Sequence, residues 1–150
     1  MKRTILILSV FISFSLLANK ASAQIEGIVG MWKTIDDDTG DAKSYVKIFK
    51  ATNGMYYGKV TKLLTEPQDK KCTACVGKKK NKKIVGMIVI TKMKIKGKGL
   101  AGGKIMDPGN GKYYYCTINL DENNKDRLNV RGSLGSFGLL GRTQVWHRLK

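Results

Sequence analysis

The sequence has 150 residues and carries 28 Lys and Arg against 11 Asp and Glu, which gives a net charge of +17 at pH 7. This length fits one domain that can support a hydrophobic core without added cross-links. Beyond the N-terminal region the longest continuous apolar stretch, Ile84 to Ile90, is too short for a membrane-spanning helix. The positive charge either favours anionic partners or serves solubility alone.

The N-terminus has the order of a signal peptide. Two basic residues precede an apolar run from Ile5 to Ala18, which is shorter than the roughly 20 residues of a spanning helix. The small residues Ala-Ser-Ala follow, and they end at Ala23. We therefore expect a signal peptide over residues 1–23 and one exported domain over residues 24–150, in the periplasm or outside the cell. An uncleaved N-terminal anchor is the alternative.

The rest of the chain shows the alternation of polar and apolar residues that is typical of β-strands. Asn53-Gly54 predicts a tight hairpin turn in which both residues have positive φ. Every second residue from Lys92 to Lys98 is Lys, so that face of its strand must lie in water. The alternation predicts strands at residues 30–35, 43–50, 55–64, 91–98, 102–106, 112–120, 127–132 and 142–149.

Residues 65–83 break this pattern. They contain Cys72-x-x-Cys75 and seven Lys between Lys70 and Lys83, and they predict a long exposed loop. The apolar stretch Ile84 to Ile90 follows and predicts either a buried strand or a short helix. The regular spacing of eight or nine short strands favours a closed or nearly closed antiparallel barrel, or a sandwich, over any α/β arrangement.

Several short motifs occur in a fixed order along the chain. They are Glu26-Gly27-x-x-Gly30-x-Trp32, Tyr57-Gly58-Lys59-Val60, Cys72-x-x-Cys75, Gly103-Lys104-Ile105-x-Asp107-Pro108, Leu128-x-Val130-Arg131-Gly132 and Gly141-Arg142-Thr143-Gln144-x-Trp146-x-Arg148. Together they resemble the bacterial family called domain of unknown function 2147, over essentially the whole mature chain. The resemblance implies an exported, all-β protein with one antiparallel lipocalin-like barrel of about eight strands. It implies no established activity, so no catalytic residue is carried over.

A second resemblance concerns the barrel floor. Trp32 on the first strand and an Arg beside the last strand's Trp resemble lipocalin-type barrels, in which the Trp closes the floor and the Arg covers it. Arg148 or Arg142 would then stack on Trp32, as a planar cation on an aromatic face. We therefore interpret Trp32 and Arg148 as structural.

The cysteines allow three interpretations. In an exported protein, Cys72 and Cys75 are expected to form a local disulfide, and redox or metal chemistry are the alternatives. A zinc site would need further ligands, for which the chain offers only Cys116 and His147. Cys116 lies on an apolar face and is expected to be a small buried residue. We assign no metal and no cofactor.

The barrel mouth is the expected place for a ligand. The candidate ligand-binding residues are Asp107, Tyr114, Arg131, Arg142 and Trp146, although Asp107 is also suited to capping its own turn. The leading hypothesis is a noncatalytic module that binds a small or elongated ligand, while the Lys70–Lys83 loop contacts an anionic envelope surface. The lysines have no interleaved aromatic residues or Arg, so specific nucleic-acid binding is not expected.

Two alternatives from other classes remain open at this point. One is an envelope enzyme, either hydrolytic or thiol-active through Cys72 and Cys75. The other is a structural envelope protein whose barrel is solid and whose basic loop makes the contacts. A spacious interior would favour the binding module, and a core filled completely by side chains would count against it.

Overall fold

The fold is given by a computed structural model, which describes residues 23–150. The predicted signal peptide, except for Ala23, lies outside the described residues, and the cut after this residue stays a prediction. Nearly all the regular structure is β. The elements are β1 (Gly30–Ile35), β2 (Ala42–Lys50), β3 (Tyr56–Leu63), the short 3-10 helix η1 (Gly77–Lys79), β4 (Ile88–Lys96), β5 (Gly99–Met106), β6 (Tyr113–Leu120), β7 (Arg127–Ser133) and β8 (Gly141–Arg148).

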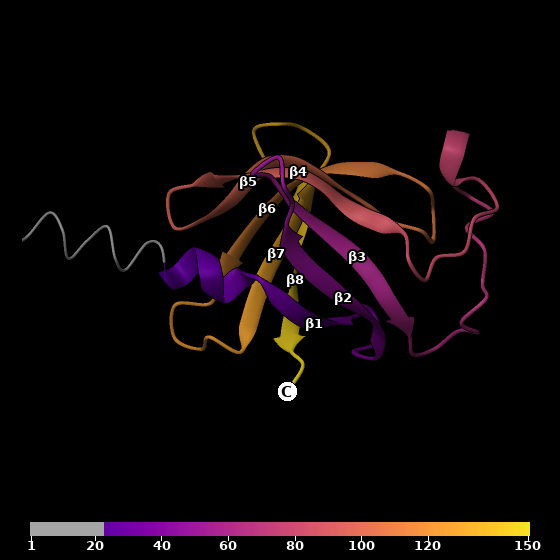
Figure 1. The fold of residues 1–150 in the computed structure, drawn as a ribbon, viewed down its shortest axis with the longest axis horizontal. Coiled ribbons are helices and arrows are strands. Elements are labelled where there is room, and N and C mark those ends of the chain that lie inside the picture. The colour runs from indigo at the N-terminus through magenta and orange to yellow at the C-terminus, as the bar shows by residue number, and fades with distance from the viewer. Residues whose placement is uncertain (1–22) are drawn as a thin grey trace, which may run out of the picture.

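The eight strands form one closed antiparallel barrel, in which each strand pairs with the next and β8 pairs back with β1 (Figure 1). The predicted all-β barrel of about eight strands is therefore confirmed. The predicted strand ends agree with the observed ones to within about one residue, except around β4 and β5. These two strands begin three residues earlier than predicted, because Gly97 and Lys98 alone form the turn between them.

The two ends of the barrel differ. We call the end with the connections 51–55, 97–98 and 121–126 the closed end, and the end with the connections 36–41, 64–87, 107–112 and 134–140 the mouth. Large side chains that are fully buried fill the closed end, because alternate strand residues point inward. They are Trp32, Ile48, Met93, Leu100, Ile118 and Leu128.

A helical turn over residues 23–28, which the sequence did not predict, covers the closed end. Ile25 and Ile28 are buried, and the indole Nε1 of Trp32 donates a hydrogen bond to the carbonyl oxygen of Ile28 at 2.9 Å. In Figure 1 this indigo turn lies on the side of the barrel opposite the loop that carries η1. None of the helices in residues 23–150 is both long and apolar enough to cross a membrane.

Arg148, and not Arg142, is the arginine that stacks on Trp32. Its guanidinium carbon lies 4.3 Å from the centroid of the indole ring. Its Nη2 also donates hydrogen bonds to the carbonyl oxygens of Gly27 and Lys125, and its Nε lies 3.5 Å from the carboxylate of Asp126. One side chain therefore joins the helical turn, β1, β8 and the β6–β7 connection.

The hairpin turn between β2 and β3 was predicted in the right place but with the wrong geometry. Ala51 pairs with Met55 through a backbone hydrogen bond, so three residues form the loop instead of two. Gly54 has φ +78°, whereas Asn53 has no positive φ. The side chain of Asn53 instead accepts a hydrogen bond from the backbone N–H of Met55. This contact favours the longer loop, in which only the glycine position needs positive φ.

The apolar stretch Ile84–Ile90 is part loop and part strand. Ile84 and Met87 are buried in the loop before β4, and the strand itself begins at Ile88. Farther along β4, Lys92 has φ +56°, which breaks the simple alternation. Ile90 and Met93 are therefore both fully buried although they are three residues apart, while Ile95 is exposed.

We predict that Arg148→Lys lowers the free energy of unfolding by about 2 kcal/mol, because lysine cannot stack a planar cation on Trp32 while donating in two directions. Chemical denaturation followed by circular dichroism would measure this change. Arg127→Lys is the matched control, since Arg127 is an exposed residue near the same end. An equal effect of the two substitutions would contradict the proposed role of Arg148.

Candidate ligand-binding site

The mouth half of the barrel contains a cavity of about 930 Å³. This volume lies within the range of small-molecule sites, which is roughly 300–1,000 Å³. Residues from all four mouth connections and from the adjoining strands line it. The barrel is therefore filled at one end and hollow at the other.

The strands give the cavity a largely apolar wall. The strands contribute their inward residues there, so the alternation that builds the core also builds the wall. Four of its eight apolar side chains are valines, which are smaller than the Ile, Leu, Met and Trp side chains that fill the closed end. The apolar wall consists of Val46, Val60, Leu63, Val89, Ile105, Met106, Val130 and Trp146.

Polar side chains also lie on the cavity wall, level with some of the apolar ones, since Ser44 pairs with Leu63 and Gln144 with Val130. Thr34 Oγ1 and Ser44 Oγ are 2.9 Å apart and share a hydrogen bond across β1 and β2. On β8, the indole Nε1 of Trp146 donates to the side-chain oxygen of Gln144 at 3.1 Å. All four residues line the cavity, so its wall offers hydroxyl and amide groups to a ligand as well as apolar surface.

Charged side chains form the rim, and most of them are paired. Lys43 binds the carboxylate of Asp36, and Lys70 binds that of Glu66. Arg142 Nε lies 3.2 Å from the carboxylate of Asp37. The rim therefore carries both signs of charge, with groups that could bind a polar head.

The carboxyl group of Asp36 is more acidic than an ordinary aspartate side chain. Its pKa is lowered to about 2, mainly because it accepts a hydrogen bond from the ammonium of Lys43. The backbone N–H groups of Thr39 and Asp38 also donate to this carboxylate. The same ion pair raises the pKa of Lys43. Asp36 thus remains charged in mild acid and holds the β1–β2 connection in place.

The turn between β5 and β6 forms another part of the rim. The carboxylate of Asp107 accepts a hydrogen bond from the backbone N–H of Gly109 at 2.8 Å, which caps the turn. The side-chain amide of Asn110 donates to the hydroxyl of Tyr114 at 3.1 Å. Asp107, Asn110 and Tyr114 all line the cavity, so the turn gives it a fixed polar edge.

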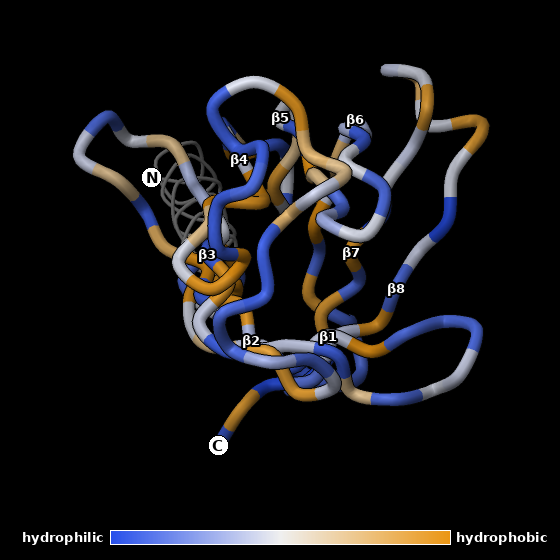
Figure 2. Tube along the Cα trace, turned by 90° about the vertical axis from the view of Figure 1, so that its right-hand side faces the viewer, coloured by the Kyte–Doolittle hydropathy of each residue, from blue (hydrophilic) through white to orange (hydrophobic). Residues whose placement is uncertain are grey.

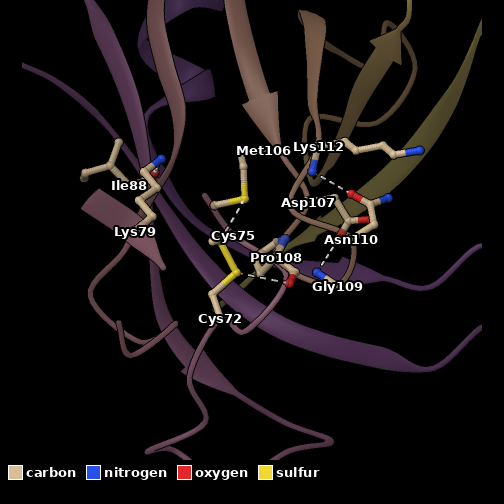
Figure 3. Close-up of a disulfide and its surroundings, with 10 residues drawn as sticks. All are labelled: Cys72, Cys75, Lys79, Ile88, Met106, Asp107, Pro108, Gly109, Asn110 and Lys112. Carbon is tan, nitrogen blue, oxygen red and sulfur yellow. Dashed lines mark hydrogen bonds between the residues drawn. A yellow bond between two sulfur atoms is a disulfide. The ribbon is translucent and has the colours of Figure 1, made fainter. Parts of the chain in front are cut away.

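The long connection between β3 and β4 packs against this turn. Cys72 and Cys75 form a disulfide, which confirms the predicted pairing. Figure 3 shows the disulfide beside Pro108 and Met106. Cys72 Sγ lies 3.3 Å from the carbonyl oxygen of Pro108, a close contact since a disulfide sulfur has no proton to donate. A Cβ on Gly111 would lie only 2.0 Å from the carbonyl oxygen of Ala74, so glycine is needed where the two loops meet.

The prediction that residues 65–83 form an exposed loop is wrong in part. The lysine side chains are mostly exposed, but Cys72 and Cys75 are buried. Lys71 and Lys83 form a β-bridge, which turns the segment into a small hairpin. Lys79 Nζ donates to the carbonyl oxygen of Ile88 and holds η1 near β4 (Figure 3). The segment is thus a folded part of the rim, and its sulfur atoms are not accessible for thiol chemistry.

The structure brings four of the five candidate ligand-binding residues together. Asp107, Tyr114, Arg142 and Trp146 line the cavity. Arg131 lies outside the cavity lining, and its guanidinium donates to the carbonyl oxygen of Gly138 at 2.6 Å. Its role there is to hold the β7–β8 connection.

Other lining residues were missed. Thr34, Ser44 and Gln144 could have been found as the polar inward positions nearest the mouth, once the strand register was known. Leu134 and Leu140, in contrast, lie on a loop whose conformation the sequence does not reveal.

The remaining candidates lie away from the cavity. Cys116 is buried, and burial raises the pKa of its thiol to about 12. His147 pairs with Lys33 near the closed end. In residues 23–150, no three His, Cys, Asp or Glu side chains are grouped as a metal site would require.

Comparisons with known proteins agree with this architecture. The family model described as "Uncharacterized protein conserved in bacteria (DUF2147)" matches residues 30–148. Among solved structures, the chain is similar to a Helicobacter pylori protein described as belonging to the lipocalin family, with a TM-score of 0.71 and 25% identity. The similarity covers 81% of this chain and 82% of that one. No curated protein matches the sequence.

We predict that Asp36→Asn destabilises the protein at neutral pH but not near pH 2. The pKa of Asp36 is lower in the folded protein than its ordinary value of 3.8, so its stabilising effect is present above that value and is lost as the pH falls through about 2. Unfolding of both proteins across this pH range would test the prediction. Lys43→Met should raise the pKa of Asp36 in a carboxyl NMR titration, and an unchanged value would contradict the assignment.

We also predict that Cys72→Ser combined with Cys75→Ser lowers the free energy of unfolding by about 2 kcal/mol, the chain-entropy estimate for so short a loop. Hydrogen exchange should become faster in residues 64–87, where the disulfide packs on the rim. The wild-type protein after reduction serves as the control and should behave like the double variant. Unchanged exchange in both would show that the disulfide does not hold this segment.

Proposed function

Because the chain belongs to the bacterial family DUF2147 and folds as a lipocalin-like barrel, we propose that it is a noncatalytic binding module for an elongated amphiphile. The cavity of about 930 Å³ carries this proposal, since it is open at the mouth, largely apolar along the strands and charged at the rim. An apolar chain would enter the barrel, and a polar head would stay among the rim residues. Such a division of apolar and polar groups is typical of small-molecule sites.

The side chains at the two levels of the cavity suit different parts of such a ligand. Val46, Val60 and Val130 offer apolar surface without hydrogen-bonding groups, so an alkyl chain would lose no hydrogen bonds there. At the rim, Lys112 and Arg142 could interact with an anionic head, while Asn110 could donate or accept hydrogen bonds. The ligand would thus bind with its head toward solvent.

The hollow interior also favours this proposal over the alternative of a purely structural barrel. A structural barrel needs no open volume, and side chains would fill it along its whole length. Here small residues occupy inward positions near the mouth, among them Ser44 and Gly132, where larger side chains would close the cavity. The vacant volume therefore favours a ligand-binding role.

We propose further that the domain acts after export, in the periplasm or outside the cell. The Cys72–Cys75 disulfide supports this location, since disulfides persist in oxidising compartments and are rare in the reducing cytosol. The N-terminal region with its basic start and apolar run supports it as well. Detection of the chain in a periplasmic or culture-medium fraction, with its N-terminus at residue 24, would test the location.

Binding of a dansyl-labelled undecanoate, with dodecanoate as the competitor, would test the ligand-binding function. We predict that Gly132→Leu weakens this binding about tenfold or more, because the new side chain would occupy the cavity. The backbone tolerates the change, since a Cβ at this position meets no atom closer than 3.5 Å. The fluorescence of the dansyl group and of Trp146 would report binding.

Thr117→Leu is the matched control, since Thr117 is exposed on β6. It should bind the probe as the wild type does. Equal affinities of the two variants would show that the probe binds elsewhere. Absence of probe binding and of competition by dodecanoate in the wild type would contradict a site for alkyl amphiphiles.

A further inference from the structure

The connection between β7 and β8 exposes an unusual number of apolar side chains. Leu134, Phe137, Leu139 and Leu140 are exposed to 67%, 93%, 86% and 70%. Figure 2 views the barrel from the side that carries η1 and shows hydrophobic segments in this connection, next to β8. We call residues 134–140 the apolar loop. Soluble proteins rarely expose such a cluster unless it contacts a partner or a membrane.

The apolar loop has a defined conformation. The backbone N–H of Leu134 donates to the carbonyl oxygen of Leu140 at 2.8 Å, and that of Gly138 donates to Gly135. Arg131 binds the carbonyl oxygen of Gly138 from the outer wall of the barrel. The loop is therefore a small hairpin held at its base, and its two most exposed side chains, Phe137 and Leu139, are not covered by the rest of the barrel.

The loop is also continuous with the cavity. Leu134 and Leu140 line the cavity, while Phe137 and Leu139 lie farther along the same loop and are the most exposed. An apolar surface therefore extends from the interior of the barrel to the tip of the loop. A partner that contacts the tip would lie at the entrance of the cavity.

Basic residues accompany the apolar loop at the mouth. The Lys70–Lys83 segment belongs to another connection at the same end and carries seven lysines. The β1–β2 connection is acidic, but Asp36 is paired with Lys43 and Asp37 with Arg142. Asp38 and Asp41 remain in that connection, so the positive charge of the mouth is concentrated in the Lys70–Lys83 segment, which contains no acidic residue. The mouth thus combines an apolar hairpin with one strongly basic segment, a combination that is typical of proteins that bind anionic bilayers.

We propose that the mouth docks on an anionic lipid bilayer, with Phe137 and Leu139 inserted among the lipids and the Lys70–Lys83 segment near the headgroups. Apolar side chains of interfacial proteins enter a bilayer by about 5–10 Å, a depth that an exposed hairpin can reach. A protein partner is less suited to this feature, since a standard protein interface uses about 20–30 residues a side. This docking goes beyond amphiphile binding and does not require it.

Vesicles of phosphatidylglycerol and phosphatidylcholine, compared with vesicles of phosphatidylcholine alone, would test the proposal. We predict that the wild type binds the anionic vesicles more tightly and that salt weakens this binding. Phe137→Ser should reduce the affinity about tenfold or more, as expected for the loss of one inserted aromatic side chain. The full exported chain would be used, and binding would be measured by co-sedimentation.

Ile95→Ser is the matched control, because Ile95 is 57% exposed but lies on β4 toward the closed end. It should leave vesicle binding unchanged. Replacing the exposed lysines Lys78, Lys80 and Lys82 with Gln should weaken binding to anionic vesicles and reduce its salt dependence. All these substitutions are at exposed positions, and circular dichroism would verify that each variant is folded.

Two results would overturn the proposal. One is equal vesicle binding by Phe137→Ser and Ile95→Ser. The other is self-association of the wild type that Phe137→Ser abolishes without changing vesicle binding, which would assign the loop to a second copy of the chain. Gly132→Leu should still bind vesicles, because its change lies within the cavity. Failure of the docking proposal can therefore be distinguished from failure of the ligand-binding proposal.

Discussion

The contact between Arg148 and Trp32 is the interaction on which the rest of the barrel depends. The register of β1 with β8 comprises two residue pairs, Trp32 with Arg148 and Lys33 with His147, whereas β7 and β8 share seven. We call this short pairing of β1 with β8 the seam. Arg148 takes part in it through its backbone, and its side chain covers Trp32. The seam lies at the closed end. Toward the mouth, Arg142 and Asp37 form an exposed ion pair between β8 and the β1–β2 connection, and such a pair contributes little stability.

This arrangement explains why the barrel is filled at one end and hollow at the other. The closed end needs tight packing because the seam, the helical turn and the β6–β7 connection meet there. Large residues such as Ile118 and Leu128 provide it, and both are fully buried. Nearer the mouth, the next inward positions on the same two strands are Cys116 and Val130, followed by Tyr114 and Gly132. On β7, the decrease from Leu through Val to Gly leaves space that neighbouring side chains do not fill.

The sequence contained enough information to predict the barrel but only part of the site. Strand alternation is a local property, so β1, β6 and β7 could be predicted nearly residue by residue. Trp32 and Arg148 could be connected through the resemblance to lipocalin-type barrels.

Irregular features depend on contacts between distant segments and could not be predicted in the same way. The positive φ of Lys92 and the packing of Ala74 against Gly111 are examples. The cavity itself arises from small residues on different strands. Only the register of the strands shows that these residues lie at the same level along the barrel axis.

The net charge of the protein does not indicate a specific partner, because many of the basic residues are spread over the barrel wall. Lys62 lies over the ring of Tyr45, and Lys104 over that of Tyr115, at 5.8 and 5.2 Å from the ring centroids. At exposed sites such contacts contribute only about 0.5–1 kcal/mol each, and the lysines still contribute to the field around the protein. A diffuse field attracts many anionic surfaces equally well. Selectivity must therefore come from features confined to one place, and in this barrel the cavity and the apolar loop are adjacent at the mouth.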